Sequence, residues 1–367
     1  MKKKERQSGI ELLRIIAMLQ IIYLHLYQYG GLRTASLGAG ELNGFITTFI
    51  WSFCRAPVDL FIMITGYFMI TAKFDIKKTA KRAGTTYGAM IFYSIGISVI
   101  YFIINPDKVN AVSVAKALFP LTSKTWYFLS NYIVILLLTP FINRMLVSLT
   151  KKQYLYFVGI IFFVMSIWST LAGVKGLNGV FRIDKIVDPY YGKSLGGFLL
   201  CYFIGGYLRL FVPCKRNEYK QYDVNIWYLI LFILLCITDL GLKYTFEQYS
   251  KVFGMFNNPL VVFEAVFLIL FFRDFKFTSK YVNLIAGTTL GIYAIHEHAY
   301  VREWLWKVIS FKDKSLYDTP LYLILVLLGC VVVFVGCGSI EFIRLKIFGF
   351  FSKIFSTTKD FLTANKE

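Results

Sequence analysis

The sequence predicts an all-α membrane protein, a polytopic bundle of about ten transmembrane helices. Of its 367 residues, 57% are hydrophobic and 18% are aromatic, and the mean hydropathy is +0.60. The chain is therefore more apolar than an ordinary soluble domain. Its hydrophobic residues are also gathered into long runs, and its basic residues are spread unevenly between the segments that join those runs.

Ten apolar stretches are long enough, or nearly so, to cross about 30 Å of hydrocarbon as helices. They cover residues 10–29, 44–71, 84–104, 125–147, 154–173, 194–213, 225–242, 258–272, 281–300 and 320–343. The first follows a basic run from Lys2 to Arg6 and so imitates a signal peptide. Because it contains Arg14 and His25 and lacks a small-x-small cleavage site directly after it, we expect a retained span.

The distribution of basic residues predicts which way the spans run. If the amino terminus is cytoplasmic, the inner segments hold 24 Lys and Arg residues and the outer loops hold 14. This excess follows the positive-inside rule, so both termini are predicted to be cytoplasmic. The net charge of +19 is then explained by topology and requires no nucleic-acid partner.

One membrane domain is expected over residues 8–345, followed by a basic cytoplasmic tail over 346–367. The six cysteines are scattered without a CxxC pair, so the sequence predicts neither a disulfide nor a zinc site. No metal is expected elsewhere. Three histidines and Glu297 offer a weak metal pattern, because the spacing His296-Glu297-His298 puts the two rings on opposite sides of a regular helix.

Arg14 and His25 are the most informative residues of the first span. Eleven residues of helix leave them about 20° apart around the axis and about 16 Å apart along it. Ionisable residues inside a membrane usually mark a buried site or a conduction path. Glu11 precedes Arg14 by three residues, so the two can pair on one helix face.

Most of the other intramembrane ionisable residues are predicted to lie in the outer half of the membrane, where they would line a shared polar cavity. They are Arg55, Asp59, Asp239, Glu264, His296, Glu297 and His298. Structural roles are open for all of them. Arg55 and Asp59, at i and i+4, can form a buried ion pair. Asp239 and Glu264 can be interfacial, and the two histidines can cap a helix end.

Several segments resemble the acyltransferase-3 membrane family. Glu11-Leu-Leu-Arg14, followed by ten residues and His25, resembles its R-x10-H signature. Four further segments resemble family elements in the family's order, and the resemblance covers roughly residues 8 to 345. They are Phe61 to Tyr67, with Thr65 in place of the usual Ser, Trp126 to Asn143 with Pro140, Gly205-Gly206-Tyr207, and Gly291 to Glu297.

The resemblance implies a multi-pass acyltransferase of the cell membrane. Such proteins move an acyl group, usually acetyl, from a cytoplasmic acyl-CoA to a hydroxyl or amino group of a cell-envelope glycan or its lipid-linked precursor. Expected partners are membrane lipid, acyl-CoA and that glycan acceptor. The acceptor sugar, the length of the acyl group, O- versus N-acylation and the oligomeric state are left open.

The chemistry of that reaction assigns expected roles to the residues. His25 is expected to act as general base or as a transient acyl carrier, and Arg14 to hold the acyl-CoA end. Arg14, Arg55 or the backbone near Gly66 can stabilise the oxyanion. The expected supporting residues are Glu11, Arg55, Asp59, Glu264, His296, Glu297 and Trp126, the last as a platform for a sugar. Lys78, Lys81 and Arg82 either receive the CoA phosphates or simply set topology.

Two other classes of function fit the same composition. A transporter, flippase or polymerase of polysaccharide units also needs intramembrane charges and broken spans. A non-catalytic membrane sensor that has kept the fold is a third reading. Removal of His25 would distinguish the first of these from an acyltransferase, because a transporter would form no covalent product that depends on it.

Overall fold

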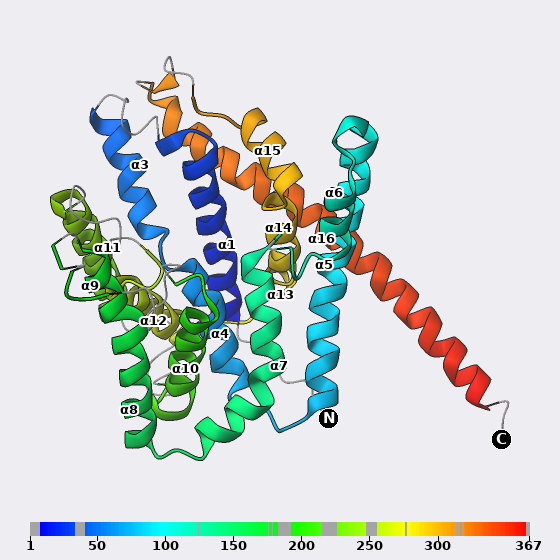
Figure 1. The fold of residues 1–367 in the computed structure, drawn as a ribbon, viewed down its shortest axis with the longest axis horizontal. Helices are drawn as coiled ribbons and strands as arrows, with labels where there is room; N and C mark the ends of the chain where they lie inside the picture. Colours follow the sequence, from blue (N-terminus) through cyan, green and yellow to red (C-terminus); the bar gives the residue numbers. More distant parts are fainter. Residues whose placement is uncertain are drawn as a thin grey trace.

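The computed structural model describes residues 8–33, 41–123, 125–174, 176–177, 179–182, 192–214, 226–246, 255–275, 277–312, 316–317 and 319–364. These residues form helices and no strand, as Figure 1 shows. The all-α class predicted from the sequence is therefore confirmed. The basic leader that contributed to the predicted topology, Lys2 to Arg6, lies outside the described residues.

Seven helical segments are long and apolar enough to cross a membrane. They are Ser8–Tyr29, Leu42–Met69, Ile76–Ile104, Tyr127–Val147, Lys151–Gly173, Ile226–Thr245 and Leu321–Phe350. Leu195–Phe211 is a shorter apolar helix. The chain is thus a multi-pass membrane protein, and the larger number of about ten spans stays a prediction.

The helices follow the expected stretches closely in several places and are divided in others. In chain order they are α1 (Ser8–Tyr29), α3 (Glu41–Phe53), α4 (Pro57–Met69), α5 (Ile76–Ile104), α6 (Ala111–Leu118), α7 (Tyr127–Val147), α8 (Lys151–Phe162), α9 (Ser169–Gly173), α10 (Leu195–Phe211), α11 (Ile226–Phe246), α12 (Pro259–Asp274), α13 (Lys280–Ala286), α14 (Thr289–His296), α15 (Ala299–Val308) and α16 (Leu321–Ala364). A short 3₁₀ turn, η1 (Pro106–Lys108), follows α5, and a π-helical stretch, η2 (Phe163–Trp168), joins α8 to α9.

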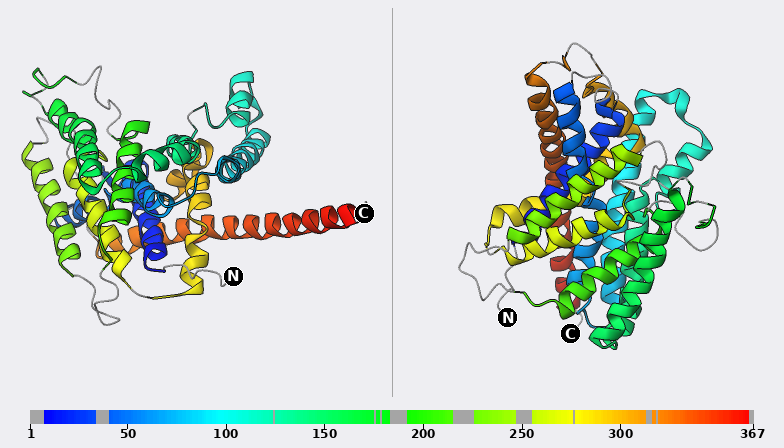
Figure 2. Two further views of the ribbon diagram at one scale, coloured as in Figure 1. Left: turned by 90° about the horizontal axis from the view of Figure 1, so that it is seen from below. Right: turned by 90° about the vertical axis from the view of Figure 1, so that its left-hand side faces the viewer.

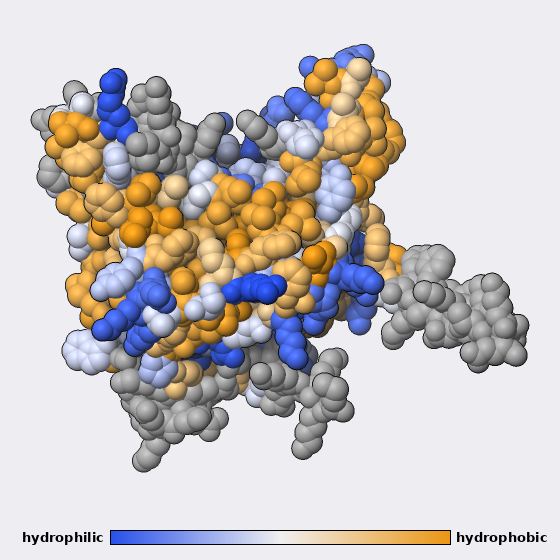
Figure 3. All heavy atoms as spheres, turned by 60° about the horizontal axis from the view of Figure 1, so that its bottom comes forward, coloured by the Kyte–Doolittle hydropathy of each residue, from blue (hydrophilic) through white to orange (hydrophobic). Residues whose placement is uncertain are grey.

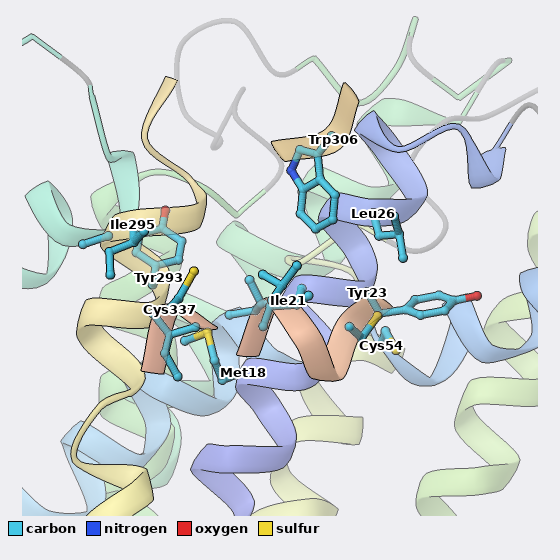
Figure 4. Packing of buried hydrophobic residues seen from close by; sticks show 14 of the residues in the cluster. Met18, Ile21, Tyr23, Leu26, Cys54, Tyr293, Ile295, Trp306 and Cys337 are labelled. Atoms are coloured by element: carbon cyan, nitrogen blue, oxygen red, sulfur yellow. The ribbon is translucent and has the colours of Figure 1, made fainter. Parts of the chain in front are cut away.

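Helix α1 lies at the centre of the bundle and contacts α3, α4, α12, α13, α14 and α16 (Figure 1). Figure 4 shows its side chains Met18, Ile21 and Leu26 packed among residues of α14, α15 and α16, including Trp306. At its first residue, Ser8 Oγ donates to Asn283 Oδ1 of α13 at 3.0 Å. The helix that carries Arg14 and His25 is therefore fixed by neighbours along its whole length.

The predicted span 44–71 is broken in the middle of the apolar run. Helix α3 ends at Phe53, and α4 begins at Pro57, because proline lacks an N–H and fits only the first turn of a helix. The carbonyl of Phe53 accepts a hydrogen bond from Gln20 Nε2 of α1 at 2.6 Å, which satisfies one backbone group that the break releases. Arg55 lies in this break.

The predicted span 281–300 is also divided, into α13, α14 and the start of α15. Helix α14 ends at His296, and Glu297 is its C-cap. His298 is the N-cap of α15, where its Nδ1 accepts from the Tyr300 backbone N–H at 3.4 Å. The chain therefore changes direction within the cluster His296-Glu297-His298, and this local break decides where the three side chains point.

Helix α16 is continuous from Leu321 to Ala364 and passes through residue 345 without interruption. The tail predicted from 346 onwards is thus, as far as residue 364, a continuation of this helix. Figures 1 and 2 show its last part projecting from the bundle.

Apolar side chains cover much of the outer surface, as expected for contact with lipid. In Figure 3 they cover the broad middle of the face shown, with hydrophilic side chains in patches beside them. Ile103 and Ile104 of α5, for example, are 75% and 71% exposed. In water such a surface would be unfavourable, so the bilayer is its natural solvent.

Two glycines allow α4 and α10 to pack at backbone contact. A Cβ added to Gly66 would overlap the carbonyl oxygen of Tyr202, and one added to Gly205 would overlap that of Met63. Small residues that let helix backbones approach are typical of packing in membranes. Both glycines belong to the segments that resemble the acyltransferase-3 family, and the structure gives them a role in helix packing.

We expect Gly66→Ala to destabilise the protein by about 1–3 kcal/mol, since a methyl group must force two backbones apart. The matched control is Gly88→Ala, because a Cβ at Gly88 of α5 meets nothing within 4 Å. Thermal unfolding of the detergent-solubilised variants, followed by size-exclusion chromatography, measures the difference. Equal unfolding midpoints for the two variants would contradict the packing role.

Candidate active site

The structure brings His25 of α1 into contact with His296 at the end of α14. His25 Nδ1 lies 3.0 Å from His296 Nε2, although the two residues are 271 positions apart in the chain. The His296 residue is fully buried, whereas the His25 side chain keeps 18% of its surface exposed. In this pair, His296 is inaccessible, whereas part of the His25 side chain is exposed.

His296 determines which nitrogen of His25 carries the proton. His296 Nδ1 lies 2.5 Å from the carbonyl oxygen of Ile292, one turn earlier in α14. A carbonyl only accepts, so the Nδ1–H of His296 donates and its Nε2 is an acceptor when the ring is neutral. His25 then donates from Nδ1 to His296 Nε2. The hydrogen-bond partners thus assign the basic lone pair of His25 to its Nε2.

Glu297 supplies a carboxylate to the same edge of His25. Its Oε2 lies 3.2 Å from His25 Nδ1, and its Oε1 accepts from Arg302 Nη1 at 2.7 Å. The Arg302 guanidinium also lies over the Tyr29 ring, 4.7 Å from the centroid. A carboxylate held in this way stabilises the imidazolium that forms when a histidine takes up a proton. His25, His296 and Glu297 therefore have the arrangement of a general base with its orienting groups.

The sequence interpretation missed Arg302 and Tyr29. Arg302 was counted only as an outer-loop charge, and it reaches Glu297 because α15 begins directly after the break at His298. Tyr29 lies four residues after His25 and shares its helix face, which is a signal that helical spacing offers. Helical periodicity does not predict the contact between Arg302 and Glu297, because the chain changes direction at His298, between the two residues.

Trp126 does not have the surface expected of a sugar platform. Its ring is 1% exposed and packs against His298, with 5.3 Å between the ring centroids. A buried ring offers no free face to a carbohydrate in this structure, so the stacking role of Trp126 stays a prediction. Trp126 instead holds the His298 end of the break in position.

Arg55 and Asp59 do not form the predicted i, i+4 ion pair. That spacing requires one continuous helix, whereas Pro57 starts a new one between the two residues. Within the described part of the chain, the electrostatic interaction of Arg55 is largest with Asp239, next with Glu264, and smaller with Asp59. All four side chains are buried and form a second polar cluster.

Aromatic rings surround the Arg55 guanidinium. It lies 4.4 Å from the Trp51 ring centroid and 5.3 Å from that of Phe256. A second cation, Lys243, also contacts Trp51: its Nζ lies 3.8 Å from the Trp51 ring centroid. Cation–π contact of this kind helps to retain a charge in apolar surroundings.

Arg14 and Glu11 pair as predicted, with 3.8 Å between Arg14 Nε and Glu11 Oε2. The Arg14 side chain is 31% exposed. Because α1 is one uninterrupted helix, Arg14 lies about 16 Å from His25 along its axis. The two residues therefore lie at different levels along α1, and they do not form one contact cluster.

Lys78, Lys81 and Arg82 lie on the first turns of α5, and all three are exposed. Near the other end of this helix, Tyr101 stacks on Tyr300, with 3.8 Å between the ring centroids, close to His298. Helical rise separates Lys78 from Tyr101 by about 35 Å. The three basic residues are thus far from His25, at the other end of α5.

A buried ion pair on α16 supports α14 one to two turns before His296. Glu341 accepts from Arg344 at 2.6 and 2.7 Å and from the Tyr93 hydroxyl of α5 at 2.5 Å. The Glu341 side chain fills the space beside Gly291, where an added Cβ would overlap it. Gly291, part of a segment that resembles the family, therefore lets α14 lie against this pair.

The described residues include no group of three or more His, Cys, Asp or Glu side chains that is arranged to hold a metal ion. The donors around His25 are two rings and one carboxylate already bound to an arginine. The arrangement instead provides an oriented base in a multi-pass membrane protein. Such a base is typical of membrane enzymes that activate a hydroxyl or a similar nucleophile.

The chain belongs to the acyltransferase-3 family, whose model, described as an acyltransferase domain, matches residues 7–340. No curated protein and no solved structure matches the chain. The matched range covers nearly the whole sequence and includes every residue of the His25 site. The protein is therefore a membrane acyltransferase that transfers groups other than aminoacyl groups.

We expect Glu297→Gln to lower acyl transfer about 100-fold, since the amide keeps the shape but loses the charge that stabilises a protonated His25. The control is Glu303→Gln, which removes an exposed carboxylate of α15 six residues later. Transfer of labelled acyl groups by membranes with equal amounts of each variant measures the effect. Similar rates for the two variants would rule out a role for the Glu297 charge.

Gly291→Ala should lower the transfer rate while the protein still folds, because Glu341 must move and α14 shifts with it. A drop of about tenfold is consistent with a small misplacement of a catalytic group. Gly336→Ala on α16 serves as the control, because its Cβ meets nothing within 4 Å. A normal rate for Gly291→Ala, at normal expression, would show that α14 tolerates the displacement.

Proposed function

We propose that this protein transfers an acyl group, acetyl in the first instance, from acyl-CoA to a hydroxyl of a cell-envelope or extracellular polysaccharide or of its lipid-linked precursor. The observation that carries the proposal is His25, a partly exposed imidazole whose Nδ1 contacts His296 and Glu297 and whose Nε2 is left as the base. A sugar hydroxyl is a poor nucleophile at neutral pH, so its transfer chemistry needs such a base.

The reaction then proceeds as follows. His25 Nε2 takes the hydroxyl proton while the hydroxyl oxygen forms a bond to the thioester carbonyl carbon. The carbon–sulfur bond breaks, the acyl ester is formed, and the CoA sulfur leaves with the electron pair and takes up a proton. Glu297, held by Arg302, stabilises the His25 imidazolium between these events.

The depth of the residues supports separate entry of donor and acceptor. With cytoplasmic termini and about ten spans in the cell membrane, as proposed from the charge distribution, Arg14 lies in the inner half and His25 in the outer half. Arg14 would hold the acyl-CoA end of the site. Lys78, Lys81 and Arg82, exposed at the start of α5, would then be accessible to the CoA phosphates from the cytoplasm.

The second polar cluster is assigned a supporting role. Arg55, Asp59 and Glu264 are buried beside α1 and α4, and Glu11 positions Arg14. A buried arginine near a reacting thioester stabilises the negative charge that develops on the carbonyl oxygen. We assign this oxyanion role to Arg55, because Arg14 lies about 16 Å from His25 along α1, and we give the backbone near Gly66 only its packing role.

The proposal is tested by the transfer of labelled acetyl from acetyl-CoA to glycan in membranes. We expect His25→Ala to lower transfer at least 100-fold, in line with loss of a general base. Arg14→Ala is expected to raise the KM for acetyl-CoA, and Arg144→Ala, which removes an exposed arginine of α7, to leave transfer unchanged. Full transfer by His25→Ala would overturn the mechanism. If wild-type membranes form no acetylated glycan at all, the protein is better explained as a transporter or polymerase.

A further inference from the structure

Two cations lie close to His25 on the side from which the acceptor is proposed to enter. One is Arg302, which contacts Glu297 and the Tyr29 ring. The other is Lys193, just before α10, whose Nζ lies 5.5 Å from the Tyr127 ring centroid and 5.7 Å from that of Phe256. Both cations act electrostatically on His25.

Helix α7 connects Lys193 to the site. Asn131 of α7 donates a hydrogen bond to the Lys193 carbonyl oxygen at 2.9 Å, which fixes the backbone at this residue. Phe128, one residue after the Tyr127 that Lys193 faces, contacts Tyr293 of α14 at 5.5 Å between the ring centroids. Helix α7 thus connects the backbone of Lys193 to α14, the helix that ends at His296, although Lys193 is 168 residues from His25 in the chain.

Both cations keep hydrogen-bond donors for a ligand. Arg302 uses only Nη1 for Glu297 and Tyr29, so its Nη2 and Nε have no partner in the described part of the chain. Lys193 is exposed, and its Nζ forms no ion pair with a described carboxylate. Lysine and arginine with free donors, beside aromatic rings, are the usual recognition elements for carboxylate and phosphate groups.

Among the described groups that contact His25 or act on it electrostatically, the positive charges exceed the negative one unless such a ligand is bound. Glu297 contributes one negative charge, and Arg302 and Lys193 contribute one positive charge each. When His25 takes the hydroxyl proton, a further positive charge appears beside them. Repulsion among like charges in a partly dehydrated site opposes that step, and a nearby anion removes the repulsion.

We propose that the acceptor carries an anionic group, a carboxylate or a phosphate, that binds between Lys193 and Arg302 while its hydroxyl faces His25 Nε2. This inference rests on the proposed function and adds the chemical class of the acceptor. The anion can belong to the sugar, as in a uronic acid, or to the phosphates of a lipid carrier. In both cases the substrate itself supplies the negative charge that the protonated His25 requires.

Binding without an acyl donor tests the inference apart from catalysis. The probes are 4-nitrophenyl glucoside, 4-nitrophenyl glucuronide and a short-chain prenyl diphosphoryl glucose, measured on the full-length protein in lipid nanodiscs. We expect at least one anionic probe to bind about tenfold more tightly than the glucoside, which corresponds to about 1.4 kcal/mol. The anionic probe that binds identifies the source of the charge.

Substitutions then assign the effect to Lys193. Lys193→Gln should weaken binding of the preferred anionic probe about tenfold and leave glucoside binding unchanged, whereas Lys193→Arg should retain most of the affinity. Lys108→Gln, which removes another exposed outer lysine, is the matched control. High salt should weaken binding of the anionic probe alone.

Equal affinity for all three probes, or equal effects of Lys193→Gln and Lys108→Gln, would overturn the inference. The proposed function is contradicted by a different result, namely full acetyl transfer in membranes that contain the His25→Ala variant. Because the binding assay contains no donor and needs no turnover, the two failures are distinguishable.

Discussion

The contact between His25 and His296 is the interaction on which the rest of the site depends. It joins the first span of the chain to a short helix near its end, and it is useful only if α1 and α14 keep their separation to within a fraction of an ångström. Neighbouring contacts supply that constraint at the start of α1 and along α14. Ser8 binds Asn283 in the middle of α13, and Glu341 fills the space beside Gly291 of α14. The helices are therefore fixed by polar contacts inside a membrane, where an unmade hydrogen bond is costly.

Broken helices place the polar groups of both clusters. Arg55 lies where α3 gives way to α4, and Glu297 lies where α14 gives way to α15. His296 and Glu297 both reach His25 Nδ1 from the end of α14, where Glu297 still has αR backbone angles. The break follows at His298, and after it α15 runs so that Arg302 reaches Glu297. A span that is interrupted inside protein can thus do what a continuous one cannot, and its free backbone groups are satisfied by neighbours such as Gln20.

Much of the fold and part of the site could be predicted from the sequence. Long apolar runs predict the helices, and helical spacing predicts the pair of Glu11 and Arg14, because both depend on local geometry. The same spacing failed for Arg55 and Asp59, since Pro57 starts a new helix between them. Arg302 could not be found at all from the sequence, because its contact with Glu297 depends on the direction that α15 takes after the break. Sequence patterns describe one element at a time, whereas these contacts depend on how elements are oriented.

The placement of charge in this site fits the reaction that we propose for it. A base that works at the acceptor end must gain a proton in surroundings that disfavour charge, so a carboxylate has to be near it, and Glu297 is. A carboxylate left alone there would itself be unfavourable, and Arg302 compensates it. Each buried charge thus requires the next as far as Arg302, and Lys193 adds a second cation at the exposed edge of the site. At this edge the protein offers positive charge, so the negative charge that balances it has to come from outside the protein. The proposed anionic acceptor provides it.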